Sequence, residues 1–276
     1  MTIKLVATDI DGTLLSSENL ISARNRAAIE AATEAGLLIA FVTGRPPRWL
    51  DPLIEMTGHL GVAVGANGAV LYDLATEQTL SSHTIATELM REVAVDLRAE
   101  FPDVRFAVEY GAEFAAEHGY IHDWEINPER DRRGNLIPPP VIAPLEVITE
   151  RPGLKLLAKD RGAEPDVFLA AAAAIAGDRA TLTHSSSYGL LEVSAPGVTK
   201  ATGLAELAER NGVAPHEVLA VGDMPNDIPM LQWAGRSYAV ANAHQSVKDV
   251  ADEVTLSNDD DAVGALIEAV LAEATR

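Results

Sequence analysis

The amino-acid sequence predicts an α/β protein: a doubly wound parallel sheet into which a smaller α+β domain is inserted. Two observations lead to this fold. Apolar strand-like runs alternate with helical stretches near both ends of the chain, and this pattern indicates a parallel sheet covered by helices on both faces. The middle of the chain, from about residue 82 to residue 188, breaks the alternation. A length of 276 residues is sufficient for one large domain or two modest ones.

The first part of the chain begins the sheet. The apolar run Lys4–Ile10 predicts a buried strand. A helix is expected over residues 22–35, because Ser22 is a good N-cap and Gly36 a good terminator. Two further apolar runs predict strands over residues 37–42 and 61–64.

The sheet is expected to resume after residue 188. The alternation returns there, with strands predicted over residues 190–193, 218–221 and 238–241 and helices over residues 200–211, 226–234 and 261–274. Residues 1–81 and 189–276 are therefore predicted to form one core domain. The inserted domain, residues 82–188, is predicted to hold helices at 88–100 and 164–176, β-like pieces at 104–108 and a polar, proline-rich loop at 127–140.

Composition limits the classes of function. Hydrophobic residues make up 47% and charged residues 22%, values typical of a soluble globular protein. A net charge of −20 and a pI near 4.6 argue against a nucleic-acid or membrane partner, since no basic surface is available in bulk. No apolar stretch approaches the roughly 20 residues of a membrane span. The absence of cysteine excludes disulfides and thiolate chemistry, and we expect a cytoplasmic protein.

Two carboxylates stand where the first predicted strand ends. Asp9 and Asp11 flank Ile10, and side chains two apart on an extended chain leave the same face, so both acids are expected to address one point. Gly12 lets the backbone turn sharply after them. Unpaired buried carboxylates are costly and usually hold a cation or take part in proton transfer. A plain Asp-Gly turn is the alternative explanation.

Polar residues also follow the second predicted strand, in the order Thr43-Gly44-Arg45. Thr43 is placed either to donate a hydrogen bond to an anion or to cap the next helix. Arg45 is either a clamp for a phosphate or an ordinary surface charge.

The C-terminal part adds a lysine, two acids and an amide. Lys200 lies in the first turn of a predicted helix, where a cation opposes the helix dipole unless an anion is near. Asp223, Asn226 and Asp227 follow a further apolar strand. Ligands of open α/β sheets bind at the carboxyl ends of the strands, where all of these groups are predicted to lie. Carboxylates without soft ligands favour Mg²⁺, and the cationic and hydroxyl groups favour a phosphate.

These motifs resemble those of the haloacid dehalogenase (HAD) superfamily, specifically its Cof-type (class IIB) phosphatases with a C2B cap. The resemblance spans essentially the whole chain and rests on four motifs in order: Asp9-x-Asp11-Gly12-Thr13, Thr43-Gly44-Arg45, Lys200 and Gly222-Asp223-x-x-Asn226-Asp227. The pairs Asn67-Gly68 and Asn242-Ala243 also resemble the family pattern. The resemblance implies a Rossmann-like HAD core, with residues 82–188 as the cap.

The resemblance also implies a Mg²⁺-dependent phosphatase that forms an aspartyl-phosphate. Asp9 would be the nucleophile. Asp11 would act as general acid and then base, a role for which we expect burial beside other anions. Mg²⁺ would be held by Asp9, the Asp11 backbone carbonyl and Asp223, and Lys200 and Thr43 would bind the transferring phosphoryl group. Four further residues would bind the phosphate or the substrate: Gly44, Arg45, Asn67 and Asn226. Asp227 would orient Lys200 and the water ligands of the metal.

Other functions on the same motifs stay open. A phosphomutase would use the same core but keep the phosphoryl group for a second acceptor. A non-catalytic phosphometabolite-binding protein would be expected to lack Asp9, Asp11 or Lys200, and a receiver-like switch would need neither Asp11 nor a cap. The expected partner is a small phosphorylated metabolite, with sugar phosphates among the candidates. The sequence identifies neither the ester nor the oligomeric state; specificity is expected from the cap, where residues 127–140 are either substrate-facing or plainly solvated.

Overall fold

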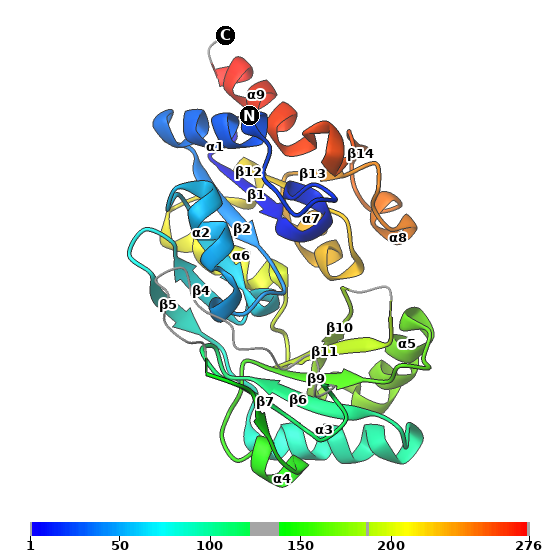
Figure 1. Ribbon diagram of the computed structural model, residues 1–276. Helices are drawn as coiled ribbons and strands as arrows, with labels where there is room; N and C mark the ends of the chain where they lie inside the picture. The colour runs from blue at the N-terminus through cyan, green and yellow to red at the C-terminus, as the bar shows by residue number, and fades with distance from the viewer. Residues whose placement is uncertain (1, 122–137, 186–187, 275–276) are drawn as a thin grey trace. The chain divides into compact units, whose positions relative to one another are not determined.

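The structure, a computed structural model, describes residues 2–121, 138–185 and 188–274 (Figure 1). The chain divides into two compact units, and each is described by itself. The first unit consists of Met1–Gly44, Pro52–Ser81 and Thr199–Arg276, and the second of Arg45–Asp51 and Ser82–Val198. The polar loop predicted over residues 127–140 lies, up to residue 137, outside the described residues.

The first unit is built on a sheet with the strand order β14-β13-β12-β1-β2-β3-β4-β5. Its strands are β1 (Leu5–Asp9), β2 (Leu38–Val42), β3 (Val62–Gly65), β4 (Val70–Asp73), β5 (Gln78–Ser82), β12 (Val218–Gly222), β13 (Arg236–Ala239) and β14 (Glu253–Val254). The strands from β14 to β3 in this order pair in parallel, and β4 runs antiparallel to β3. Strands β1 and β12 are buried along their whole length, as expected of central strands covered on both faces. The predicted doubly wound parallel sheet is confirmed. The antiparallel strand β4 was not predicted.

Helices cover this sheet. They are α1 (Ala23–Glu34), α2 (Asp51–Thr57), α6 (Lys200–Arg210), α7 (Ile228–Trp233), α8 (Gln245–Lys248) and α9 (Ala262–Ala274). Helix α1 begins as predicted, because the Ser22 hydroxyl accepts a hydrogen bond from the Asn25 backbone N–H at 3.0 Å. Helices α1 and α9 lie side by side, and Arg24 of α1 donates two hydrogen bonds to Glu268 of α9.

The second unit is an α+β module, as predicted for the insertion. Its sheet has the order β10-β11-β9-β6-β7-β8. The strands are β6 (Arg105–Glu109), β7 (Phe114–Ala116), β8 (Val141–Ile142), β9 (Lys155–Lys159), β10 (Thr181–Thr183) and β11 (Leu190–Ser194), and the helices are α3 (Thr87–Glu100), α4 (Leu145–Ile148) and α5 (Pro165–Ala176). A core of buried apolar side chains joins sheet and helices, with Phe106 on β6, Leu97 on α3 and Phe168 on α5 among its members. The insertion therefore has a hydrophobic core of its own.

Strand β11 lies in the second unit and not in the core sheet. It pairs antiparallel with both β10 and β9. The second unit extends to Val198, so the boundary predicted between residues 188 and 189 lies too early in the chain. The physical reason is that a short apolar run predicts a strand without specifying its partner. Here the partners are β10 and β9, and neither strand was predicted from the sequence.

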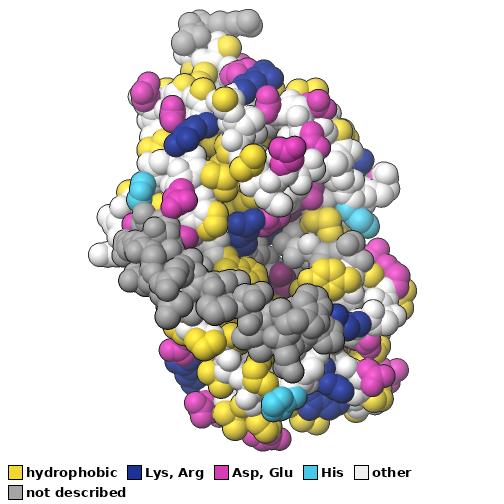
Figure 2. Space-filling model, viewed as in Figure 1, with side chains coloured by type: hydrophobic (Ala, Val, Ile, Leu, Met, Phe, Trp, Pro, Cys, Tyr) yellow, Lys and Arg dark blue, Asp and Glu magenta, His cyan; other side chains and the backbone are white. Residues whose placement is uncertain are grey.

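Charge is spread over the face of the molecule that Figure 2 draws. The face drawn in Figure 2 carries acidic side chains among apolar and basic ones, without one dominant acidic patch. This distribution fits a general surface charge more closely than a single docking surface. Among the described residues, no helix combines the length and the apolar character that a bilayer span requires.

Candidate functional site

The end of β1 and the tight turn that follows it form the first part of the site. Asp9 is the last residue of β1 and is buried. The chain then turns tightly through Ile10–Leu14, with Gly12 at a φ of 79°. A side chain at Gly12 would collide with the carboxylate of Asp223, so this position needs glycine for both its backbone conformation and its space. The glycine thus lets the loop after β1 approach the loop after β12.

Lys200 is the charged centre of the site. It is the first residue of α6, is buried, and its ammonium donates to Asp9 Oδ1 and to Asp227 Oδ1, each at 2.5 Å. The Thr199 hydroxyl caps the same helix by accepting from the Thr202 backbone N–H. A cation in a first helical turn is unfavourable on its own, and the expected nearby anions are present. The predicted contact of Lys200 with a phosphoryl group stays a prediction.

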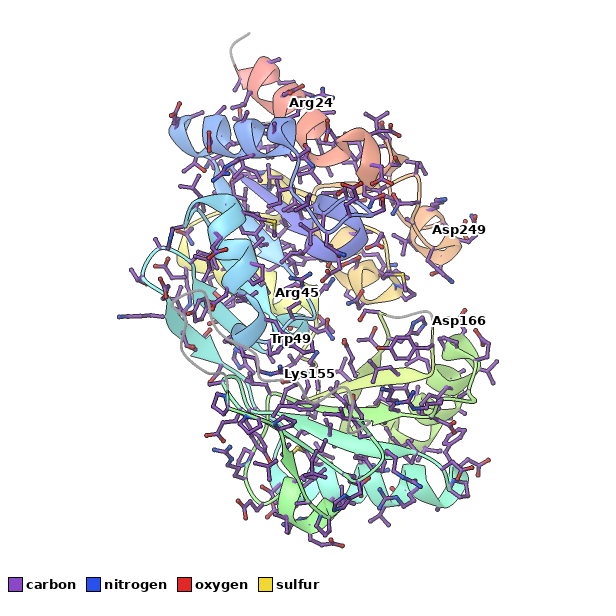
Figure 3. All side chains as sticks on the ribbon, viewed as in Figure 1. Arg24, Arg45, Trp49, Lys155, Asp166 and Asp249 are labelled. Atoms are coloured by element: carbon purple, nitrogen blue, oxygen red, sulfur yellow. The ribbon has the colours of Figure 1, made fainter. Side chains whose placement is uncertain are left out.

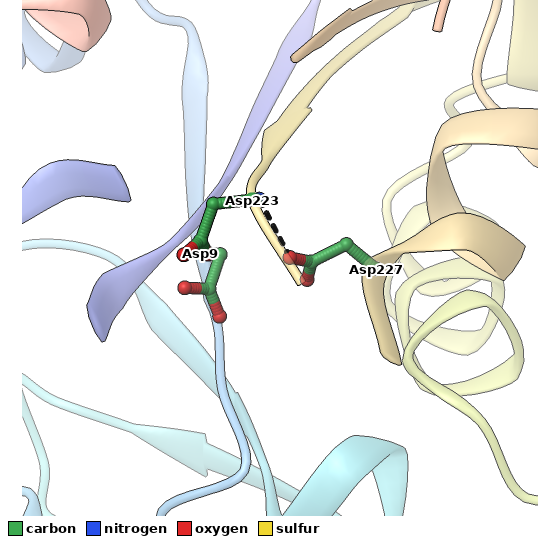
Figure 4. Close-up of side chains that lie close together, drawn as sticks. All are labelled: Asp9, Asp223 and Asp227. Carbon is green, nitrogen blue, oxygen red and sulfur yellow. Dashed lines mark hydrogen bonds between the residues drawn. The ribbon is translucent and has the colours of Figure 1, made fainter. Parts of the chain in front are cut away.

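The turn after β12 supplies two more carboxylates. Asp227 Oδ2 accepts from the backbone N–H groups of Asp223 and Met224, at 2.9 Å and 3.0 Å, which closes the turn (Figure 4). The Thr13 hydroxyl donates to Asp223 Oδ1 at 3.1 Å. The carboxylates of Asp9, Asp223 and Asp227 each offer an oxygen within 4.8 Å of the others, and all three residues are buried. Among the described residues, they form a group able to hold a metal ion.

The electrostatics of this group call for a further positive charge. Burial raises the pKa of Asp223 to about 7, and the charge of Asp227 adds to this effect. Burial also raises the pKa of Asp9 well above its ordinary value, against the opposing charge of Lys200. Burial by itself would lower the pKa of Lys200, but the charges of Asp227 and Asp9 outweigh it and raise that pKa. Lys200 is therefore an ammonium ion, and three ionised carboxylates around it would leave an excess of two negative charges.

A divalent cation with a preference for oxygen fits this donor set. It would neutralise the excess charge, and carboxylate oxygens are hard ligands of the kind that Mg²⁺ takes. The turn that carries Asp227 also holds a buried amide. Within the described residues, Asn226 Oδ1 has no hydrogen-bond partner, while its Nδ2 donates to Asn67.

The loops after β2 and β3 complete the strand-end cluster. Thr43 is buried, and its backbone N–H donates to the Val64 carbonyl at 2.9 Å. The next helical turn begins at Pro47 with Pro46 as its N-cap, so Thr43 is not a helix cap. Asn67 is also buried, and its side-chain oxygen accepts from Asn226 Nδ2 at 3.1 Å. The structure thus joins Asn67 to the predicted site.

Arg45 belongs to a different unit from Thr43 and Gly44. The segment Arg45–Asp51, which carries the labelled side chains of Arg45 and Trp49 in Figure 3, groups with the second unit. There the Arg48 guanidinium donates to both carboxylate oxygens of Glu109 and lies 4.1 Å from the centre of the Trp49 ring. The Arg48–Glu109 pair is almost fully buried. The predicted contact of Arg45 with a phosphate therefore stays a prediction.

Asp11 departs from the expectation. Its side chain is exposed, whereas Asp9 is buried, because β1 ends at Asp9 and strand alternation does not continue through the turn. Two further residues hold the site together without a role predicted from the sequence. The Thr13 hydroxyl donates to Asp223, and the Asn242 side chain donates to the Gly12 carbonyl at 2.8 Å. Thr13 and Asn242 both belong to motifs that the sequence showed, Asp9-x-Asp11-Gly12-Thr13 and Asn242-Ala243. The sequence therefore contained a signal for each residue.

Comparison with known proteins identifies the family. The model for haloacid dehalogenase-like hydrolases matches residues 6–267. The chain belongs to this family. It is 31% identical over 272 residues to the 5-amino-6-(5-phospho-D-ribitylamino)uracil phosphatase YcsE of Bacillus subtilis (strain 168), an alignment that covers 96% of this chain and 94% of that protein.

Two solved structures share the fold. SMU.1108c from Streptococcus mutans UA159 matches with a TM-score of 0.84 at 24% identity, covering 98% of this chain and 100% of that one. The HAD subclass IIB sugar phosphatase BT4131 matches with a TM-score of 0.79 at 23% identity, covering 96% and 98%. The Cof-type HAD assignment made from the motifs is confirmed, and this HAD protein is a phosphatase.

Proposed function

We propose that this HAD phosphatase hydrolyses a small phosphate monoester with Mg²⁺ and an aspartyl-phosphate intermediate on Asp9. The supporting observation is the placement of Asp9: a buried carboxylate at a strand end, 2.5 Å from the ammonium of Lys200 and grouped with Asp223 and Asp227. We also propose a cytoplasmic location, which suits a chain without cysteine.

The reaction balances in two displacements. An oxygen of Asp9 bonds to phosphorus, the bond from phosphorus to the leaving oxygen breaks, and Asp11 gives its proton to that oxygen. Water then attacks phosphorus, Asp11 takes its proton, and the bond between phosphorus and Asp9 breaks to release phosphate. The exposure of Asp11 leaves it open to both the leaving alcohol and water.

The other residues bind and orient. The Lys200 ammonium neutralises charge at the transferring phosphoryl group, and Thr43 and Gly44 at the end of β2 and the side chain of Asn226 donate hydrogen bonds to it. Asp227 holds Lys200 in place through its 2.5 Å ion pair. Asp9, Asp223 and the Asp11 carbonyl would hold Mg²⁺, which when bound supplies positive charge at the phosphoryl oxygens.

For the substrate we propose a phosphorylated sugar or polyol. One relative is named for a phosphoribityl substrate and one structural neighbour is titled a sugar phosphatase. We further propose that the second unit acts as the cap that selects the ester. The phosphomutase alternative shares the core, so the deciding test is direct. Purified protein with Mg²⁺ should release inorganic phosphate from such esters without an added bisphosphate and should stop on chelation; transfer without release would favour the mutase.

We predict that Asp11→Asn separates substrates by leaving group. General acid catalysis is worth about 10²–10⁴-fold, and an alkyl phosphate needs it because an alkoxide leaves poorly. Turnover of alkyl esters should therefore fall by about 10³-fold. With p-nitrophenyl phosphate, a rapid burst of nitrophenol equal to the enzyme concentration should persist, followed by slow hydrolysis of the intermediate. Equal losses on both substrates, with Mg²⁺ binding intact, would remove Asp11 from the acid role.

We predict that Mg²⁺ stabilises the protein more strongly as pH rises. The raised pKa of Asp223 means that the folded, metal-free protein keeps a proton there that the unfolded chain releases at lower pH. That stabilisation is present near pH 4 and is lost as pH rises through about 7, so the metal-free Tm should fall over this range. Mg²⁺ replaces the proton, and its Tm shift should grow from about pH 5.5 to about pH 8. The control, Asp223→Asn, should lose most of this dependence; a wild-type shift independent of pH would contradict the prediction.

A further inference from the structure

The turn that carries Asp11 is built around a glycine. Gly12 has a φ of 79°, and a side chain there would collide with the Asp223 carboxylate. Glycine meets both demands, but it is also the residue with the greatest backbone freedom. Asp11 directly precedes it, and its side chain is exposed. The orientation of Asp11 therefore depends on contacts that restrain the turn from outside.

Hydrogen bonds restrain this turn on both sides of Asp11. The Leu15 backbone N–H donates to the Ile10 carbonyl at 2.9 Å, which closes the turn. Within the closed turn, the Asn242 side chain donates to the Gly12 carbonyl at 2.8 Å. This second bond acts on the flexible residue itself, because it fixes the direction of the peptide group that follows Gly12. Asn242 thus removes freedom that the glycine would otherwise give to the turn.

Asn242 is held firmly in the loop after β13. Its Oδ1 accepts from the Asn258 backbone N–H at 3.0 Å, and Asn258 Nδ2 in turn donates to the Leu15 carbonyl at 2.9 Å. The same loop is joined to the turn after β12, since the His244 backbone N–H donates to the Asp223 carbonyl at 2.8 Å. Both ends of the Asn242 amide are used, the nitrogen on a carbonyl and the oxygen on an N–H, so its orientation is defined.

We propose that Asn242 is a positioning residue that holds the Gly12 peptide and thereby orients the Asp11 carboxyl group for proton transfer. The inference rests on the proposed function, in which Asp11 is the general acid and base. Proton transfer requires the acid within hydrogen-bond reach of the leaving oxygen. A displacement of about 1 Å can lower a rate about 10²-fold, so a fixed turn matters for this step.

The test compares an ester that needs the acid with one that needs it little. At saturating Mg²⁺, Asn242→Ala should lower turnover of an alkyl phosphate by about tenfold to a hundredfold. Single-turnover release of nitrophenol from p-nitrophenyl phosphate should stay within about twofold of the wild type, because nitrophenolate leaves without a proton. Unchanged alkyl turnover, or equal losses on the two esters, would overturn the proposal.

A double-mutant cycle shows whether Asn242 acts through Asp11. Asn242→Ala added to Asp11→Asn should cause no further loss on the alkyl ester, because the group that it orients is already gone. Losses that multiply in the double variant would contradict the proposal. Failure of the proposed function looks different: the wild-type protein would then release no phosphate, or Asp11→Asn alone would affect both esters equally.

A second variant separates the donor of the amide from its acceptor. The carboxylate of Asn242→Asp still accepts from the Asn258 N–H but offers no donor to the Gly12 carbonyl, so alkyl turnover should fall at least as far as in Asn242→Ala. Alkyl turnover near that of the wild type in Asn242→Asp would contradict the proposal.

Gln245→Ala is the matched control for the Asn242 variants. It removes a neighbouring exposed amide, which donates to Asp249 at 2.7 Å, and should leave the rates on both esters unchanged. A selective loss of alkyl turnover in Gln245→Ala as well would contradict a specific role for Asn242. Urea unfolding curves confirm that each variant is folded.

Discussion

Asp9→Asn is expected to abolish turnover of every phosphate ester, with a loss of at least about 10⁴-fold. The amide has nearly the same size and can still accept a hydrogen bond from Lys200, so the fold should persist. It is neither a competent nucleophile toward phosphorus nor a charged metal ligand. The measurement is phosphate release from p-nitrophenyl phosphate and from sugar phosphates at saturating Mg²⁺.

Stability provides the control for this variant. The site carries excess negative charge without its cation, so removing one carboxylate should leave the metal-free Tm equal to or above that of the wild type. Asp249→Asn, an exposed acid on the same unit, should leave both rate and Tm unchanged. Rates near those of the wild type in a folded Asp9→Asn protein would remove the covalent mechanism.

The parts of the fold that follow local rules could be predicted from the sequence. Apolar runs gave β1, β2, β3 and β12, and Ser22 and Gly36 marked the ends of α1 within a residue or two. Partner choice was not predictable in the same way. Strand β11 has an ordinary apolar pattern, and its place in the second sheet depends on pairing with β9 and β10, which the run itself does not encode. Strands β4 and β5, at one end of the sheet, were missed because their polar positions give a weaker pattern.

The site residues also divide into those that local sequence rules predict and those that depend on tertiary structure. Acids and a lysine at strand ends pointed to one place because parallel strands bring their carboxyl ends together, and in the structure Lys200 pairs with Asp9 and Asp227. The contrast between buried Asp9 and exposed Asp11 depends on where β1 ends, and strand ends are the least certain feature of a sequence pattern. The bond between Asn67 and Asn226 joins residues too distant in sequence for any local rule to reveal.

Lys200→Met is expected to lower the free energy of unfolding much more than the loss of an exposed ion pair does. Methionine has a similar length without the charge, so it leaves Asp9 and Asp227 buried and uncompensated. Removing one partner of a buried pair costs about 3–5 kcal/mol, and the free energy of unfolding in EDTA should fall by about this amount. The rate should also fall by about 10³-fold, since Lys200 neutralises charge at the phosphoryl group. Urea unfolding and steady-state kinetics measure the two effects.

The exposed pair of Lys4 and Glu217 is the matched control. Its 2.7 Å separation resembles that of the Lys200 pairs, but the Lys4 side chain is 54% exposed. Lys4→Met should therefore cost no more than about 1 kcal/mol and leave the rate unchanged. Adding Asp227→Asn to Lys200→Met should restore part of the lost stability, because one uncompensated charge is gone, while the rate stays low. Equal stability costs for the two lysines would contradict the expected effect of burial. Recovery of activity together with stability would mean that Lys200 acts only as a structural counter-ion.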